Sequence, residues 1–192
     1  MASRGWACPA IASAIAAGLL PEIAKLVAGV DRALTSARLR FTLFNMGMFA
    51  FNGLTAEAFY LALEMTVGPG RDAGSVALKV LLDMTLFAPL IGLMTIAVAY
   101  TWREERFSIP RLARQIGPRW YARRVGTMLI PCWAYWIPMT ALMYSLPASL
   151  TFVFGNLASA ASAILLTTIA ANTAPSHQIL QGPRGMPVPD PD

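Results

Sequence analysis

The sequence predicts an all-α protein, an integral membrane bundle of four or five transmembrane helices with an Arg-rich segment at the membrane interface. The composition is 56% hydrophobic and only 13% charged, with a mean hydropathy of +0.55, whereas soluble domains average about 25% charged residues. The run Val76–Tyr100 is 25 residues long and carries only two charges, Lys79 and Asp83. At about 1.5 Å per residue, a helix of this length crosses the ~30 Å hydrocarbon core of a bilayer.

Charge asymmetry is the third observation. Segments 31–40 and 101–125 are both basic and are separated by two apolar runs, so both lie on the same side of the membrane, while the turn between the runs carries a net negative charge. This is the distribution that the positive-inside rule describes. We therefore attribute the net charge of +5 to basic loops that set the orientation of the protein in the membrane, and we expect no nucleic-acid partner.

The same composition argues against several classes of site. The chain has two cysteines, both in apolar runs, and a single histidine in its polar tail. It carries no Cys/His cluster, no Gly-rich phosphate loop and no Gly-x-Ser-x-Gly elbow, which are the patterns of metal, nucleotide and hydrolase sites. We therefore expect no metal and no cofactor.

The first apolar run is Cys8–Val30, interrupted by Pro21, Glu22 and Lys25. We interpret it as a kinked first span, with a cleaved signal peptide or organelle presequence as the alternative. Small residues recur on one helical face at Ala10, Ala14 and Gly18. Such a face allows another helix to approach closely.

The second predicted span is Phe41–Leu63, which follows the polar connector Asp31–Arg40 and contains one acid, Glu57. A turn over 64–75 includes the sequence Gly68-Pro69-Gly70, which predicts a chain reversal. The third span is Val76–Tyr100, and we expect a kink at Pro89 because proline removes a helical hydrogen bond.

The segment Thr101–Val125 has seven arginines and two glutamates, with apolar residues every four positions at Leu112, Ile116 and Trp120. This pattern predicts a helix that lies in the membrane interface and binds anionic lipid head groups. The alternative is a solvated basic loop, and Pro118 counts against one unbroken helix. The residues expected to face lipid are Arg111, Arg114, Arg119, Arg123 and Arg124.

Two apolar runs follow. Thr127–Leu146 contains Pro131 and Pro138 together with aromatic residues that suit an interface, so we expect an interfacial or re-entrant piece. Ala148–Ala170 is the last span, with small residues at Gly155, Ser159 and Ala163. The tail has a net charge of −1, and this favours four spans over five. We expect one helical membrane domain over 1–171 and a disordered Pro-rich tail over 172–192.

Charges at membrane depth are the candidate functional residues. Glu57 and Asp83 each lie 13 residues from Gly70, so a helical hairpin would place them at similar depth, with Lys79 one turn from Asp83. Because isolated charges are costly in hydrocarbon, they face a partner or water. Glu57, Lys79 and Asp83 are therefore interpreted either as the polar lining of a solute path or as a structural Lys79–Asp83 pair. An intramembrane enzyme that uses Glu57 and Asp83 as acid and base is a further alternative.

Several stretches together resemble one family. They are Gly53-Leu54 with Glu57 and Phe59-Tyr60; Lys79 with Leu82-Asp83-Met84 and Phe87-Ala88-Pro89; and Trp133, Trp136, Pro138, Tyr144 and Leu146-Pro147. Over residues 10–170 the chain resembles a divergent member of the Mpv-type/peroxisomal membrane protein family, small integral proteins of the mitochondrial inner membrane and of peroxisomes.

The resemblance implies a small-solute channel or a protein that shapes organelle membranes. Its location would be the mitochondrial inner membrane or the peroxisomal membrane. We therefore expect a channel-like protein rather than an enzyme, with a structural or partner-binding role as the alternative. Its expected partners are the bilayer, anionic lipid head groups and, in a homo-oligomer, further copies of the chain.

Overall fold

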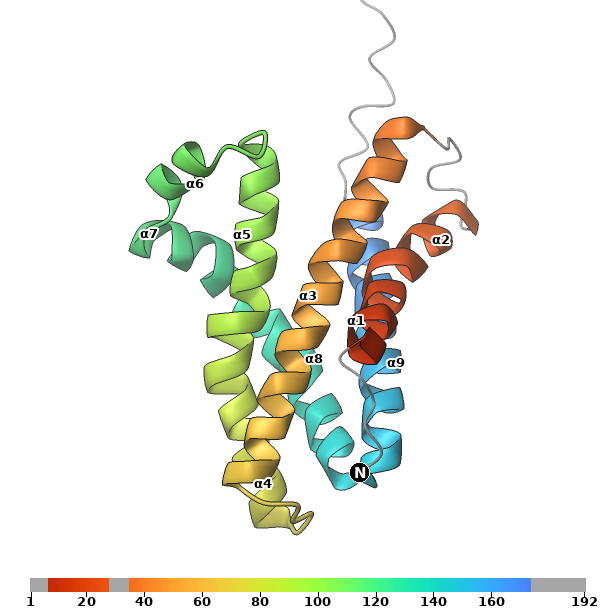
Figure 1. The fold of residues 1–192 in the computed structure, drawn as a ribbon, viewed down its shortest axis with the longest axis vertical. Coiled ribbons are helices and arrows are strands. Elements are labelled where there is room, and N and C mark those ends of the chain that lie inside the picture. The colour runs from red at the N-terminus through yellow and green to blue at the C-terminus, as the bar shows by residue number, and fades with distance from the viewer. Residues whose placement is uncertain (1–6, 28–34, 174–192) are drawn as a thin grey trace, which may run out of the picture.

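The computed structural model describes residues 7–27 and 35–173, and within those ranges the chain contains helices and no strands (Figure 1). The predicted all-α class is thus confirmed for the described residues. The first helix is continuous over α1 (Ala7–Ser13), η1 (Ala14–Leu19) and α2 (Leu20–Val27). It packs against α3 (Ser36–Thr66).

The contact between the first helix and α3 confirms the predicted small-residue face. A Cβ atom added to Gly18 would lie 2.7 Å from the Cα atom of Met46, which is backbone. On the facing surface, a Cβ atom on Gly53 would lie 2.6 Å from the Cβ atom of Ser13. Both glycines are buried, so the two helices approach closely because these positions carry no side chain.

Residues 31–34 of the predicted connector lie outside the described residues. Its remaining part is helical, because Thr35 caps α3 by accepting a hydrogen bond from the backbone N–H of Arg38. At the other end of α3, Gly68 has a φ of +92°, a left-handed conformation that favours glycine. The predicted chain reversal is therefore confirmed at this residue.

Asp72 then caps the next helix. Its carboxylate accepts hydrogen bonds from the backbone N–H groups of Gly74 and Ser75, each at 3.1 Å, and from the Ser75 hydroxyl at 2.6 Å. These hydrogen bonds favour the charged form of Asp72 and so lower its pKa from the ordinary value. The bond from the Ser75 hydroxyl has the largest effect.

The predicted third span is one continuous helix, α4 (Ala73–Leu82), η2 (Asp83–Gly92) and α5 (Leu93–Glu104). The segment η2 is a π-helix, as the hydrogen bond from the Leu93 N–H to the Ala88 carbonyl shows. In this i→i−5 pattern the partner of Pro89 would be the Met84 carbonyl, but proline has no N–H to donate. The Trp133 indole N–H bonds to that carbonyl at 3.0 Å instead.

The Arg-rich segment forms two short helices and a π-helical turn: α6 (Ile109–Gln115), α7 (Pro118–Tyr121) and η3 (Ala122–Gly126). The break precedes Pro118, and the predicted apolar stripe divides there. Trp120 is buried against Ala97 and Val125, whereas Ile116 is 39% exposed. A single interfacial helix is therefore not what the structure contains.

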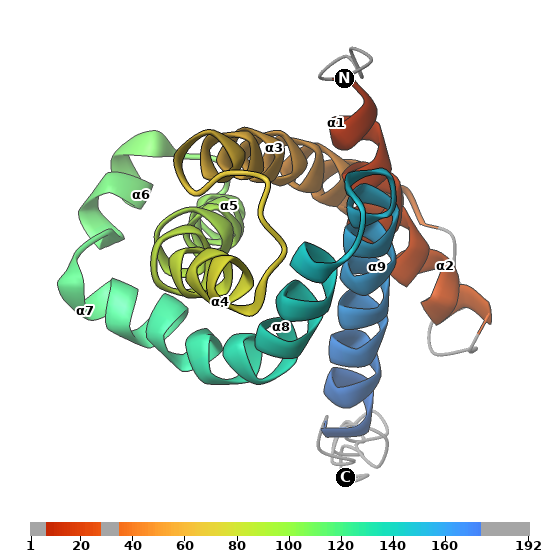
Figure 2. The same cartoon turned by 90° about the horizontal axis from the view of Figure 1, so that it is seen from below.

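Two long helices complete the described chain, α8 (Thr127–Ser145) and α9 (Ala148–Thr173). α8 continues through Pro131 and Pro138, where the sequence suggested a broken piece. Viewed from below, the α4–η2–α5 helix lies in the middle, with α3, α6, α7 and α8 around it (Figure 2). α9 contacts α8 and the first helix on the far side of α8.

Within the described ranges, three helices are long and apolar enough to cross a membrane: Ala7–Val27, Ala73–Glu104 and Pro118–Ser145. The distribution of side chains is also that of a membrane protein. Large apolar residues such as Leu90 and Ile130 are 59% and 74% exposed. Three charged residues within these helices, Glu22, Lys79 and Asp83, are buried instead, which a lipid environment favours. α3 has 31 residues, but it is more polar than these helices. The choice between four and five spans stays a prediction.

Candidate functional site

A cavity of about 810 Å³, partly open to the surface, lies between the first helix, α3, η2–α5, α8 and α9. Its lining follows α3 from Phe41 to Tyr60 and the central helix from Asp83 to Tyr100. The 19 steps along α3 correspond to about 28 Å at the rise of an α-helix. This length is close to the ~30 Å of the hydrocarbon core, so the cavity is elongated along the direction in which the helices would cross a membrane.

One end of the cavity is formed around Asp83, whose side chain comes from the first turn of η2. Asp83 is 2% exposed, and its carboxyl group accepts a hydrogen bond of 2.8 Å from the Tyr144 hydroxyl. The Phe87 ring, one turn further along η2, lies 5.0 Å from the Phe59 ring and 6.3 Å from the Tyr60 ring. The carboxyl group is thus held in an aromatic surrounding with one polar contact from the protein.

The other end is formed around Glu22, which is 6% exposed. Lys25 donates a hydrogen bond to its carboxylate, and the Arg38 Nε atom lies 3.4 Å from the second oxygen. Near this cluster, the Arg103 guanidinium lies 4.2 Å from the centre of the Phe41 ring. In the sequence, Glu22 is recognisable only as an interruption of the first span. Lys25 carries the opposite charge three residues after Glu22. This spacing is the sequence signal that could have predicted a buried ion pair.

Amide and hydroxyl groups line the middle of the cavity. The Tyr100 hydroxyl donates to the Asn45 side-chain oxygen at 3.1 Å. The Asn52 side-chain oxygen is buried and has no hydrogen-bond partner among the residues that the structure describes. Hydroxyl donors of the lining are used by main-chain carbonyls, for example Tyr135 to Ala158 at 2.7 Å.

The three predicted intramembrane charges do not share one cavity. Only Asp83 lines the cavity; Glu57 is half-buried and is not part of the lining. Lys79 is 5% exposed and donates to the Gly70 carbonyl at 3.1 Å, at the loop end of the helix. Within 7–27 and 35–173 no ion pair joins Lys79 to Asp83. The structural-pair interpretation was wrong because the long lysine side chain reaches toward the helix end.

The same geometry bears on the acid–base alternative. An enzyme that used Glu57 and Asp83 on one substrate would need both carboxyl groups at one cavity. The structure places only Asp83 there. In the described part of the chain, no three His, Cys, Asp or Glu side chains are arranged to hold a metal ion.

The residues of the family-like stretches divide into three groups. Phe87, Ala88 and Trp136 line the cavity, and Pro89 and Trp133 are linked through the Met84 carbonyl described above. Pro138 and Pro147 are exposed. The aromatic residues of α8 were expected at the membrane interface, but Trp133, Tyr135 and Tyr144 donate hydrogen bonds to other helices.

The basic residues predicted to face lipid are exposed on α6, α7 and η3, at the opposite end of the central helix from α4 (Figure 1). They are Arg111, Arg114, Arg119, Arg123 and Arg124. Arg124 forms an exposed ion pair with Glu104, and such pairs contribute little to stability. None of these arginines lines the cavity.

The chain was compared with models of protein families, with curated proteins and with solved structures, and nothing matches it significantly. The resemblance to the Mpv-type/peroxisomal membrane protein family therefore stays a prediction.

Proposed function

We propose that this chain is a multi-pass membrane protein that conducts small solutes along its interior cavity. The observation that carries the proposal is the extent of the cavity, about 810 Å³ distributed over nearly the thickness of a hydrocarbon core. A pocket for one ligand has no need of that length, whereas a conduction path does. Asp83 lies at one end and the Glu22 cluster at the other.

Asp83 is the residue that we expect to select among solutes. Among the described residues it has no cationic partner, and a buried carboxylate without one is costly. A proton or a cationic solute can supply the missing positive charge. Glu22 is already balanced by Lys25 and Arg38. The path therefore favours cations with N–H donors over anions, as carboxylate-lined channels do.

Three planar solutes of similar size test this proposal: guanidinium, urea and acetate. Purified full-length protein in vesicles should admit guanidinium fastest and acetate slowest, with guanidinium at least about tenfold above acetate. Ala56→Phe adds a ring inside the cavity and should reduce all fluxes. Ala58→Phe adds the same ring at an exposed position of the same helix and should leave them unchanged. Vesicles that admit none of these solutes above protein-free controls would refute conduction.

Selection by Asp83 is tested separately. Asp83→Asn should bring the guanidinium and urea fluxes together, whereas Glu57→Gln changes a carboxyl group outside the lining and should preserve their ratio. Cys132→Lys places an ammonium group in the same cavity and should also abolish the preference. Equal guanidinium and urea fluxes through the wild type would refute selection but not conduction.

A second role is supported by the exposed arginines of α6, α7 and η3. Basic residues next to apolar helices attract anionic lipids, so this surface would hold the chain to head groups or to a partner. Replacing Arg111, Arg114 and Arg119 with glutamine should weaken the binding of anionic lipid to the detergent-purified protein while insertion is retained. Unchanged binding would argue against this role.

The family resemblance supports an organelle location, the mitochondrial inner membrane or the peroxisomal membrane. A fluorescent tag combined with protease protection of each terminus tests that location. Termini on opposite sides would exclude an even number of crossings, and termini on the same side would exclude an odd number. The same experiment therefore decides between four and five spans.

A further inference from the structure

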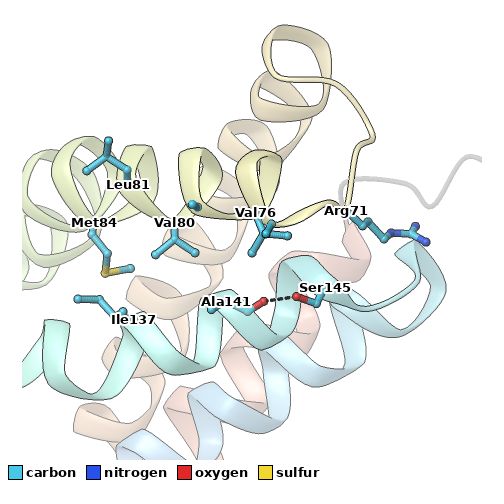
Figure 3. A pocket seen from close by; sticks show the side chains of 10 residues that line it. Arg71, Val76, Val80, Leu81, Met84, Ile137, Ala141 and Ser145 are labelled. Atoms are coloured by element: carbon cyan, nitrogen blue, oxygen red, sulfur yellow. Dashed lines mark hydrogen bonds between the residues drawn. The ribbon is translucent and has the colours of Figure 1, made fainter.

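A second cavity, of about 690 Å³, lies between α4–η2 and α8 (Figure 3). Val76, Val80 and Met84 line it from the central helix, and Ile137 and Ala141 line it from α8. All five side chains are apolar. The two helices that form the groove both belong to candidate membrane spans. Lipid chains are therefore the surroundings in which this groove would lie.

The groove has a polar end. Arg71 lies there, in the loop before α4, and the Ser145 hydroxyl lies at the matching end of α8 (Figure 3). Ser145 donates to the Ala141 carbonyl at 2.8 Å, so its hydrogen is used within α8. Arg71 is exposed and has no ion-pair partner in the part of the chain that the structure describes. It lies two residues before the span Ala73–Glu104, which places its charge at head-group level.

The dimensions match one leaflet. Eight residues separate Val76 from Met84, a rise of about 12 Å along the helix, and Arg71 precedes Val76 by five residues. One leaflet contributes about half of the ~30 Å hydrocarbon core. The groove is thus apolar over most of a leaflet and carries the Arg71 guanidinium where the lipid head groups begin, while the neighbouring Asp72 carboxylate is hydrogen-bonded in the cap of α4.

We propose that this groove binds one phospholipid, with an acyl chain along Val76, Val80 and Met84 and the phosphate at Arg71. The charge decides the occupant, because an arginine at the mouth of an apolar groove pairs with phosphate. The site is separate from the Arg-rich segment, which lies at the opposite end of the central helix (Figure 1). It also does not depend on conduction through the interior cavity.

Native mass spectrometry of the full-length protein in detergent tests the site, with phosphatidylglycerol and diacylglycerol as probes. The wild type should retain one phosphatidylglycerol and hold diacylglycerol, which lacks the phosphate, more weakly. Arg71→Gln should weaken phosphatidylglycerol binding about fivefold, the effect of one surface arginine. Ala77→Phe adds a ring beside the groove lining and should displace the acyl chain.

Matched controls separate a specific site from lipid that surrounds any membrane protein. Arg40→Gln removes another exposed arginine, one outside the Arg-rich segment, and Ala58→Phe adds a ring on another exposed face; both should bind phosphatidylglycerol as the wild type does. Equal loss in the controls, or full binding by Arg71→Gln and Ala77→Phe, would overturn the proposal. Arg71 is exposed, so its variant should retain the thermal stability of the wild type and provides a result even if Ala77→Phe does not fold.

Discussion

Gly18→Ala should weaken the packing of the first helix against α3. The new Cβ atom would lie 2.7 Å from the Met46 Cα atom and 2.9 Å from its N atom. Ordinary Cβ contacts begin near 3.4 Å, so the two helices must separate by about 0.7 Å. Both contacted atoms are backbone and cannot rotate away. Overpacking of this kind costs about 1–3 kcal/mol, against a gain of about 0.5–1 kcal/mol from replacing a helical glycine. We expect a net loss of about 1–2 kcal/mol.

Gly47→Ala is the matched control, because it makes the same substitution in the facing helix α3 one residue from Met46. Gly47 is exposed, and a Cβ atom there would meet nothing within 4 Å. Only the helix-propensity gain remains, so this variant should be about 0.5–1 kcal/mol more stable. Reversible unfolding in mixed detergent micelles measures both free energies. If Gly18→Ala proves as stable as Gly47→Ala, the close approach of η1 and α3 is refuted.

Three further substitutions have predicted outcomes. Tyr144→Phe leaves the buried Asp83 carboxyl without its hydrogen bond and should lower the free energy of unfolding by about 1–3 kcal/mol. Trp120→Phe removes the buried bond of 3.2 Å to the Thr101 hydroxyl and should cost about 1 kcal/mol by the same measurement. Asp72→Ala removes the cap of α4 and should lower the midpoint of thermal unfolding at neutral pH. Because the pKa of Asp72 is lowered on folding, its contribution is fully present above the ordinary value of 3.8 and is lost as the pH falls through the lowered pKa. The two midpoints should therefore converge below pH 3.8, and a constant difference there would contradict the cap.

Much of the fold could be predicted from the local sequence. The apolar run Val76–Tyr100 lies within one continuous helix, and Gly68 reverses the chain where the Gly-Pro-Gly sequence predicted a turn. Both predictions depend on neighbouring residues alone. The small-residue face at Gly18 was predicted in the same way, from a spacing of four.

The candidate site was predicted less well. Asp83 was identified from its depth, and it does line the cavity, but Glu57 and Lys79 were grouped with it and do not. Counting residues from a turn estimates how deep a side chain lies. It does not fix the rotation of each helix about its axis, and that rotation decides which side chains share a cavity.

The sequence by itself determined that the chain is helical, apolar and rich in arginine at one end of its central helix, because these properties follow from composition and periodicity. The tertiary structure alone decided which distant residues meet. The Trp133 indole N–H donates to the Met84 carbonyl, 49 positions away, in place of the N–H that Pro89 lacks. Arg38 contacts Glu22, 16 positions away. Such pairs depend on how helices pack together, and packing is set by contacts along their whole length rather than by any local pattern.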